Sequence, residues 1–450
     1  MKRLICAILC GILVLGAVAC STPNPNYVAK NARAFTDAPT EDATATPTAE
    51  HQKNLEKDKT TKEPMTTPTP KTTEQTGQTE ERDVNAYNTY AYALAAQLLT
   101  GDTNENCSPY SLYFALAMLC EGAQGQTRQE LLTLLGVPDL DTLRQNCAGM
   151  LADFTYDTQY SVLDTHNSLW LAKRFDGTFH DTFTENLAER YHAAAASVDF
   201  GGSEASQKIA DWIAKYTRGA IAPAPGTLQF SANTVMALVN TIYLKDAWDN
   251  EFNPQNTASD TFTKADGSTV QVDFMQRGFS DYAATVGDGY VRLTVNLAAV
   301  GSMTFVLPDE GFDLSAMLAG DGAIEHLLCD GIDGRYDVTF KLPKFSFDAR
   351  YDLPAVLQRM GVTTAFGDGA DFSGISDIPS AVDTVVQETH IAVDENGVEA
   401  AAYTMISNRA TSVMPVERPA LSVILNRPFL FAIEARDGST LFIGVVRDPS

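Results

Sequence analysis

Apolar positions in the middle of the chain recur first with a helical period. Between Val84 and Leu99 they fall every three or four residues, which predicts an amphipathic helix. The stretch from Pro109 to Leu119 is apolar nearly all round and predicts a helix buried on every side. Thr127 and Glu130 have the spacing of a capping box and are expected to open another short helix. A further amphipathic helix is expected around Ile209 to Tyr216.

The period then changes to that of β-strands. Thr234 to Leu244 is a mostly apolar run, which predicts a strand buried on both faces. Five later runs are further strand candidates: Met303–Leu307, Val338–Leu342, Val385–Val393, Leu430–Ile433 and Leu441–Val446. Helices in the first half and strands in the second predict an α+β domain built on large, mainly antiparallel sheets.

The N-terminus has the features of a targeting segment. Lys2 and Arg3 precede an apolar run from Leu4 to Val18, which is shorter than the roughly 20 apolar residues that a transmembrane helix needs. The run ends in Ala-Val-Ala-Cys20, which resembles a bacterial lipoprotein signal with Cys20 as the lipid-modified residue. An Ala-x-Ala site for ordinary signal peptidase fits the same letters. We therefore expect residues 1–19 to be a signal peptide and the protein to be exported, as a cell-surface lipoprotein or in fully secreted form.

Residues 20–82 differ in amino-acid composition from the rest of the chain. They are rich in Thr, Pro, Ala, Lys and Glu, with scarcely a large apolar residue. Such a segment buries too little surface to offset its chain entropy, so we expect a disordered tether between the lipid anchor and a folded domain over residues 83–450. The formal net charge of −25 weighs against nucleic acid and anionic membrane surfaces as partners, because phosphates would be repelled. A membrane contact is expected only through the lipid anchor.

The usual signs of a metal site or of catalysis are missing from the sequence. Of the cysteines beyond the signal region, four lack CxxC spacing and are expected to be buried free thiols: Cys107, Cys120, Cys147 and Cys329. No GxSxG, HExxH, GxxxxGK[ST] or GxGxxG motif occurs, so we expect neither an enzyme nor a cofactor. Three lone histidines are interpreted as structural or surface groups: His166, His192 and His390. A dispersed Ser-His-Asp triad, which only geometry could identify, is a distant alternative.

The most informative segment lies near the C-terminus. From Asp394 to Thr404 the chain reads DENGVEAAAYT, in which a strand-like run meets a glycine and then small residues. The alanines favour a helix and would pack weakly in a strand. The segment is therefore ambivalent: mobile or partly helical when exposed, yet able to enter a sheet where larger side chains would clash.

This string is similar to the hinge of the serpin reactive-centre loop, whose usual form is E-x-G-T-E-A-A-A-x-T. Further strings resemble the family's landmarks, occur in the family's order, and extend the resemblance to essentially Val84 to Asp448. They are NCSPYSL from Asn106 with the GAQGQT that follows, NSLWL from Asn167, LVNTIYLKDAW from Leu238, SMTFVLP from Ser302, LPKFSF from Leu342 and NRPFL from Asn426. One such string would be weak evidence, whereas seven in order are strong.

The resemblance implies an α+β serpin fold of three β-sheets and about nine helices, with an exposed reactive-centre loop at about residues 396–418. It also implies a serine protease inhibitor that acts as a suicide substrate. The protease cleaves the loop, is held as a covalent acyl-enzyme, and is trapped when the cleaved loop inserts into the main sheet. We expect a monomer whose partner is a serine protease. The alternative is a non-inhibitory binding or chaperone protein with the same fold.

The family's hinge positions correspond here to Glu395, Gly397, Val398, Glu399, Ala400, Ala401, Ala402 and Thr404. In an inserted strand, successive side chains alternate between two faces. Every second residue from Val398 to Thr404 is small or modest and suits burial, while the residues between them, which include Glu399 and Tyr403, suit the solvent face. Val398 replaces the usual Thr or Ser, and a branched apolar residue there could slow the first step of insertion.

The position of the cleaved bond also follows from the resemblance. Counting from the hinge glycine as in the family places the bond between Thr411 and Ser412. A threonine before the bond suits elastase-like or subtilisin-like enzymes. Counting back from the C-terminus gives a position near Glu417 instead. Arg409 and Met414 are nearby alternatives, which would favour trypsin-like or chymotrypsin-like targets.

Other family positions lie where the main sheet would open. Four polar residues match the family's cluster beneath the opening point, where hydrogen bonds must switch as the strand enters: Ser108, Ser111, Asn240 and Gln387. Trp248 matches the aromatic residue at the top of the opening. Ordinary core packing is the alternative interpretation of each. Asp246 stands where the family usually has Gly, and Asn426 where it usually has Asp.

Overall fold

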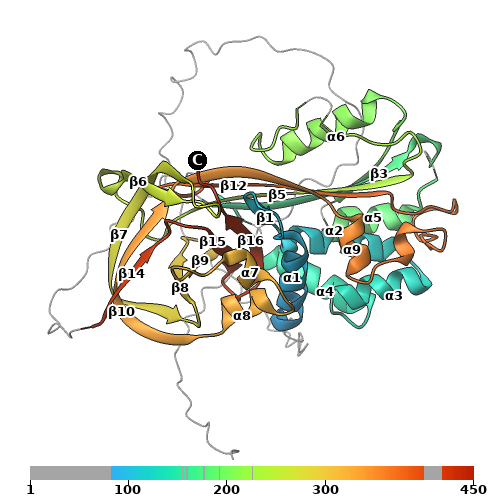
Figure 1. Ribbon diagram of the computed structural model, residues 1–450. Coiled ribbons are helices and arrows are strands. Elements are labelled where there is room, and N and C mark those ends of the chain that lie inside the picture. The colour runs from blue at the N-terminus through green and yellow to red at the C-terminus, as the bar shows by residue number, and fades with distance from the viewer. Residues whose placement is uncertain are drawn as a thin grey trace, which may run out of the picture.

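The computed structural model describes residues 83–154, 156–158, 161–175, 178–191, 193–224, 227–399 and 418–450 (Figure 1). The nine α-helices within these ranges are α1 Val84–Leu98, α2 Pro109–Gly122, α3 Gly125–Leu134, α4 Leu140–Phe154, α5 Asp181–Tyr191, α6 Ser203–Tyr216, α7 Leu314–Leu318, α8 Ala323–Cys329 and α9 Pro354–Arg359. The strands are β1 Glu105–Cys107, β2 Tyr156–Asp157, β3 Val162–Ala172, β4 Ala193–Val198, β5 Met236–Ala247, β6 Ala258–Thr263, β7 Thr269–Val286, β8 Tyr290–Asn296, β9 Gly301–Pro308, β10 Ile332–Pro343, β11 Phe345–Asp352, β12 Thr384–Val393, β13 Gly397–Val398, β14 Ala420–Ile424, β15 Phe429–Ala435 and β16 Thr440–Val446. The helices and strands expected from the periodicity are all present, and the α+β class is confirmed.

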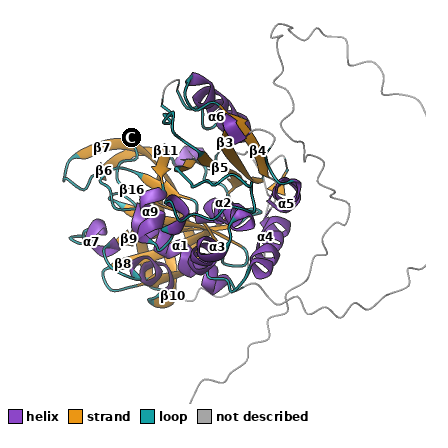
Figure 2. Cartoon of the chain, turned by 90° about the vertical axis from the view of Figure 1, so that its right-hand side faces the viewer, coloured by secondary structure: helices purple, strands orange, loops and turns teal. Residues whose placement is uncertain are grey.

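Seven strands form what we call the central sheet. Its order is β11-β12-β13-β5-β3-β2, with β4 beside β3. Helix α6 lies over one face of this sheet, and α2, α4 and α5 lie over the other (Figures 1 and 2). The predicted burial of β5 on both faces follows from this position, because it is an inner strand covered from either side.

The other nine strands form a second sheet, in the order β1-β16-β15-β9-β8-β7-β10-β14, with β6 beside β7. The resemblance implies three sheets, whereas the described residues form two hydrogen-bonded ones. Two long strands explain the difference. β7 spans 18 residues, and its pairing with β10 continues past an irregularity between Tyr336 and Val338, so that two adjoining parts become one continuous sheet.

Helix α2 forms the centre of the core. Ser108 caps its N-terminus by accepting a hydrogen bond from the Ser111 amide at 3.2 Å, and Pro109 supplies a first residue whose missing N–H costs nothing. Every residue of the helix is buried, because the two sheets and the neighbouring helices surround it. The cap therefore fixes Ser108 and Ser111 directly beneath the central sheet.

The capping box predicted at Thr127 and Glu130 is wrong. Helix α3 begins two residues earlier, and its first turn receives no side-chain cap. The Thr127 hydroxyl instead accepts a hydrogen bond from the Asp371 amide at 3.0 Å. The Glu130 carboxylate accepts from the amides of Thr363 and Thr364, both at 2.8 Å. Both side chains serve a distant loop rather than their own helix, which a local spacing rule cannot detect.

The four cysteines of the described residues are free thiols. Cys107, Cys120 and Cys147 are buried as expected, but Cys329 is exposed, because it ends α8 at the surface of the molecule. Burial raises the pKa of each of the three buried thiols well above its ordinary value, which suppresses the reactive thiolate. Among the described residues no helix is long and apolar enough to cross a membrane.

Candidate functional site

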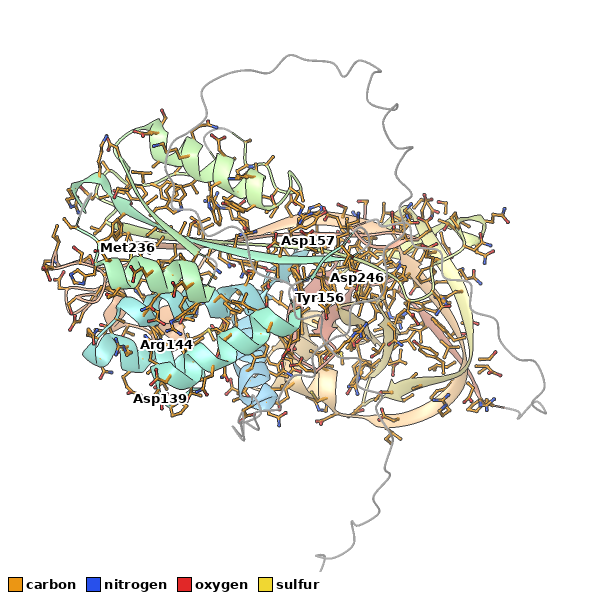
Figure 3. All side chains as sticks on the ribbon, turned by 180° about the vertical axis from the view of Figure 1, so that it is seen from behind. Asp139, Arg144, Tyr156, Asp157, Met236 and Asp246 are labelled. Atoms are coloured by element: carbon orange, nitrogen blue, oxygen red, sulfur yellow. The ribbon has the colours of Figure 1, made fainter. Side chains whose placement is uncertain are left out.

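Strands β12 and β5 of the central sheet pair directly over part of their length and diverge over the rest. We call the space between these two strands the gap. Strands β12 and β5 pair in parallel from Thr384 opposite Ala237 to Glu388 opposite Thr241. Beyond these residues the strands are no longer paired with each other, and β13 lies between them: Val398 is opposite Val393 on β12 and Asp246 on β5. We call the paired part the closed half and the part occupied by β13 the mouth. Figure 3 shows β5 running from Met236 to Asp246, at the mouth.

Main-chain hydrogen bonds hold the hinge in the mouth. The Trp248 amide donates to the Asn396 carbonyl and the Phe252 amide to the Glu395 carbonyl, both at 2.9 Å. The Glu399 amide donates to the Ala392 carbonyl at 2.7 Å. The first residues of the predicted hinge are therefore already part of the central sheet.

Gly397 is required by this arrangement. A Cβ at this position would lie 2.1 Å from the Asp246 carbonyl oxygen and 2.7 Å from the Ala247 Cα. Both contacts are to backbone, which cannot rotate away. Only glycine lets the hinge approach β5 this closely.

The alternation predicted for the hinge begins as expected. Val398 is 2% exposed and packs against the buried face of the sheet, while Glu399 points to the face covered by α6. Glu399 has a φ of 48°, in the left-handed region that non-glycine residues rarely occupy. The chain therefore turns out of the sheet at this residue.

Glu395 is tied to the neighbouring strands by its side chain. Its carboxylate lies 2.9 Å from the Lys344 ammonium and accepts a hydrogen bond from the Thr257 hydroxyl at 2.8 Å. Burial alone would raise the pKa of Glu395, but Lys344 and Thr257 outweigh it and hold the pKa below its ordinary value. Lys344 lies within the landmark string LPKFSF, but the sequence alone gives it no role at this site, because 51 residues separate it from Glu395 along the chain.

Trp248 and Asp246 close the top of the mouth. The buried indole of Trp248 donates from Nε1 to the Asp394 carbonyl at 2.9 Å and meets the edge of Phe252. Asp246 is fully buried, and its carboxylate accepts from the Ser161 hydroxyl at 2.6 Å and from the Val300 amide at 2.7 Å. Burial raises the pKa of Asp246 in spite of these bonds. A residue that the sequence marks only as unusual thus joins β5 to two neighbouring segments.

A polar cluster joins the two strands in the closed half. Gln387 donates from Nε2 to the Ser108 carbonyl at 2.8 Å and to the Ser111 hydroxyl at 3.1 Å. The Ser111 hydroxyl donates to Asn240 Oδ1 at 2.5 Å, and Asn240 Nδ2 donates to Asn167 Oδ1 at 2.7 Å. The structure therefore brings the four predicted residues together and adds Asn167, which the sequence analysis missed as a member of the cluster.

The cluster lies in one row across the sheet. Asn167 is opposite Asn240 between β3 and β5, and Asn240 is opposite Gln387 between β5 and β12. Among the described residues, Asn167 Nδ2 is buried without a hydrogen-bond partner. Hydrogen bonds in this row hold the strands together, and one donor stays unsatisfied while they do.

The remaining predicted site residues lie outside the described residues. These are Ala400, Ala401, Ala402, Thr404, Arg409, Thr411, Ser412, Met414 and Glu417 of the loop, and Cys20 at the predicted lipid site. The predicted signal peptide and tether lie outside them as well. The part of the chain that the structure describes contains no group of three His, Cys, Asp or Glu side chains suited to a metal ion.

Comparisons with known proteins agree with this geometry. The family profile described as serpin (serine protease inhibitor) matches residues 85–449. Alpha-1-antiproteinase 2 of Equus caballus is 31% identical over 359 residues, which cover 77% of this chain and 82% of that protein. The chain therefore belongs to the serpin family, as the resemblance predicts. Serpins are in general protease inhibitors rather than enzymes, although some are non-inhibitory.

Solved structures give the same fold. Serpin48 of the insect Tenebrio molitor matches with a TM-score of 0.72 and 27% identity, covering 83% of this chain and all of that one. Thyroxine-binding globulin in complex with thyroxine matches with a TM-score of 0.68 and 27% identity, covering 82% of this chain and 99% of that one. The fold is therefore shared with a protein whose solved structure is a complex with thyroxine.

Proposed function

We propose that the protein inhibits a serine protease by suicide-substrate trapping. The observation that carries the proposal is the position of β13 at the mouth of the gap, where Val398 pairs with both β12 and β5 and Gly397 pairs with β5. Further insertion would continue the same strand into the closed half. The obstacle there consists of the β12–β5 ladder and the polar cluster.

The register of β13 supports this continuation. Each step forward along the hinge corresponds to one step back along both β12 and β5. Ala400 would then enter between Ile391 and Leu244, and Ala402 between Thr389 and Ile242. All four of these neighbours are buried, so only small side chains would fit beneath the sheet.

Thr404 would enter in the row of the polar cluster, between Gln387 and Asn240. These two side chains are now joined by a hydrogen bond of 3.4 Å. A hydroxyl that both donates and accepts would replace that bond without leaving either partner unsatisfied. The hinge therefore carries a polar residue at the one inward position where the sheet is polar.

The chemistry of the trap is an interrupted hydrolysis. The protease serine would attack the carbonyl carbon of Thr411, the Thr411–Ser412 peptide bond would break, and the new amine of Ser412 would leave with the proton delivered by the protease histidine. The ester would persist if insertion displaced the protease before water attacked. An inserted strand of about fifteen residues is about 50 Å long, which is the length of a domain.

About a dozen new ladder hydrogen bonds would drive the step. Each contributes about 0.5–1.5 kcal/mol net, so the sum makes the transition one-way. The threonine before the bond favours an elastase-like or subtilisin-like target. Export, with a lipid on Cys20 or by secretion, would place the inhibitor where it meets such proteases.

The alternative function is non-inhibitory binding. The specific observation in its favour is the branched apolar side chain of Val398, which is buried in the mouth where the family usually has the polar Thr or Ser. A hinge held firmly by this side chain would not advance. The fate of the loop separates the two functions: a trapped protease, or cleavage without trapping.

The test is to incubate the protein with an elastase-like protease and to analyse the mixture by denaturing gel and mass spectrometry. We expect a complex that survives denaturation and a released peptide that begins at Ser412. A Thr411→Arg variant should transfer trapping to a trypsin-like enzyme, which would fix the bond. Clean cleavage by a panel of elastase-, subtilisin-, trypsin- and chymotrypsin-like enzymes, with each protease still active, would favour the binding function.

A further inference from the structure

Glu399, where the hinge leaves the sheet, contacts both strands that border the gap. Its carboxylate Oε1 lies 3.9 Å from Nε2 of His390 on β12. The same carboxylate also interacts with the side chain of Tyr243 on β5. One side chain of the hinge therefore bridges the gap from one border to the other.

The position of this bridge matters for insertion. In the continued register of β13, His390 and Tyr243 lie on either side of the place that Ala401 would take, on the same face of the sheet. The Glu399 carboxylate thus lies over the row that the hinge must enter next. Before the hinge can advance, this carboxylate must move aside and the backbone of Glu399 must leave its left-handed conformation.

We propose that His390 and Tyr243 position Glu399 as a clasp across the gap, and that the charge on His390 sets how fast the hinge advances. This inference rests on the proposed insertion of the hinge and names residues that regulate it. The sequence analysis interpreted His390 as a structural or surface group, and the structure gives that side chain two carboxylate neighbours instead.

Asp348 on β11 fixes the orientation of the histidine ring. His390 Nδ1 lies 2.6 Å from Asp348 Oδ1. A neutral ring that donates from Nδ1 to Asp348 offers Glu399 an Nε2 without a proton. A protonated ring has a donor at both nitrogens and attracts both carboxylates. The clasp is therefore strong when the histidine is charged and weak when it is neutral.

Other charged groups lie close to the clasp on each neighbouring strand. Arg350 on β11 pairs with Glu388 on β12 at 3.4 Å, so these two largely offset each other. On β5, Lys245 attracts Glu399 in the same sense as the histidine does. Arg218, which follows α6, lies over the Tyr243 ring at 5.5 Å. His390 and, on β3, His166, which pairs at 2.9 Å with Asp164 opposite Tyr243, are the imidazoles of this surrounding set. Imidazoles are the side chains that ordinarily change charge between pH 5 and 8.

The Glu399 carboxylate is only partly satisfied in the clasp. Burial raises the pKa of Glu399, opposed by its interactions with Tyr243, His390 and Lys245. The second carboxylate oxygen, Oε2, is buried without a hydrogen-bond partner among the described residues. Release of Glu399 to solvent would satisfy this oxygen, so a modest loss of attraction from His390 is enough to free it.

The test measures insertion without any protease. A synthetic peptide with the sequence of residues 400–411 is mixed with the intact protein, and its annealing into the gap is followed by the rise in Tm. We expect annealing in the wild type to be about fivefold slower at pH 6 than at pH 8. This is the size of effect expected when one half-buried ion pair must break before the peptide enters. His390→Gln should anneal at the faster rate at both pH values, and Tyr243→Phe should be faster than the wild type at both.

The matched control is His326→Gln. His326 on α8 is also paired with an aspartate, Asp330 at 2.8 Å, but it is remote from the gap. This variant should keep the wild-type difference between the two pH values. If the peptide does not anneal, the same comparison is made on the chain's own loop after cleavage, by measuring how fast heat-resistant protein accumulates.

Two results would overturn the clasp: equal wild-type rates at both pH values, or a difference that persists in His390→Gln. Neither depends on trapping. A pH effect that requires His390, in a protein that traps no protease, would keep the clasp and remove the inhibitory function. Trapping of a protease by a protein whose annealing rate does not depend on pH would keep the inhibitory function and remove the clasp.

Discussion

The mouth and the closed half of the gap are held by different means. In the mouth, a two-residue strand joins β12 and β5, and glycine lets the backbones meet. In the closed half, the same strands pair directly, and side chains of the Gln387–Asn240 row link them to α2 beneath. The mouth is therefore already in the geometry of an inserted strand. The proposed insertion would be resisted by this pairing in the closed half and by the Glu399 clasp beside it.

The largest expected effect concerns the mouth. Gly397→Ala would place a Cβ against the backbone of β5, so the hinge must leave the sheet or the strands must separate. We expect the free energy of unfolding to fall by about 3 kcal/mol, measured by chemical denaturation. The control is Gly369→Ala, because a Cβ at Gly369 would make only an ordinary 3.7 Å contact with Thr364. This variant should change the free energy of unfolding by less than about 0.5 kcal/mol. Equal effects would mean that the hinge is not packed in the mouth.

An intermediate effect is expected in the closed half. Gln387→Leu would leave the Ser108 amide without its acceptor and remove a donor from the cluster. We expect a loss of about 2 kcal/mol in the free energy of unfolding, together with faster annealing of the loop peptide. Gln358→Leu, at an exposed position of α9, is the control. A destabilised protein whose annealing rate is unchanged would show that the cluster does not resist insertion.

The smallest effect concerns the Lys344–Glu395 pair beside the mouth. Because the ammonium is partly exposed, Lys344→Met should lower the free energy of unfolding at pH 7 by about 0.5–1 kcal/mol. The folded pKa of Glu395 is below its ordinary value, so the pair stabilises above that value and the contribution is lost as pH falls through the folded pKa. On acidification, the free energy of unfolding of the variant should therefore fall less than that of the wild type. An identical pH profile for both proteins would exclude this linkage.

Much of the site could be predicted from the sequence because its residues lie within short strings. The string from Glu395 to Thr404 indicates both the hinge and its alternation, and Val398 and Glu399 follow that alternation in the structure. Periodicity likewise indicates β5 as a buried strand, because a strand that is covered on both faces has a strong apolar pattern, and it indicates β12 as a strand.

The rest could not be predicted, because it depends on pairing across the fold. Lys344 reaches Glu395, and His390 reaches Asp348, only because β11 and β12 are antiparallel neighbours. Thr127 and Glu130 have a local spacing that their distant partners override. The exposure of Cys329 depends on where α8 ends at the surface. No local pattern contains this information.

The most direct test of the central claim is a pair of substitutions on adjacent residues, assayed for protease trapping by denaturing gel. In the continued register, Ala402 would enter the buried face of the central sheet and Ala401 the face toward α6. Insertion in this register predicts that Ala402→Arg turns the protein into a substrate, which is cleaved while the protease stays active, because an arginine cannot be buried between Thr389 and Ile242. It predicts that Ala401→Arg still forms the covalent complex. Equal trapping by both variants, or loss of trapping in Ala401→Arg alone, would contradict insertion of the hinge in the register of β13.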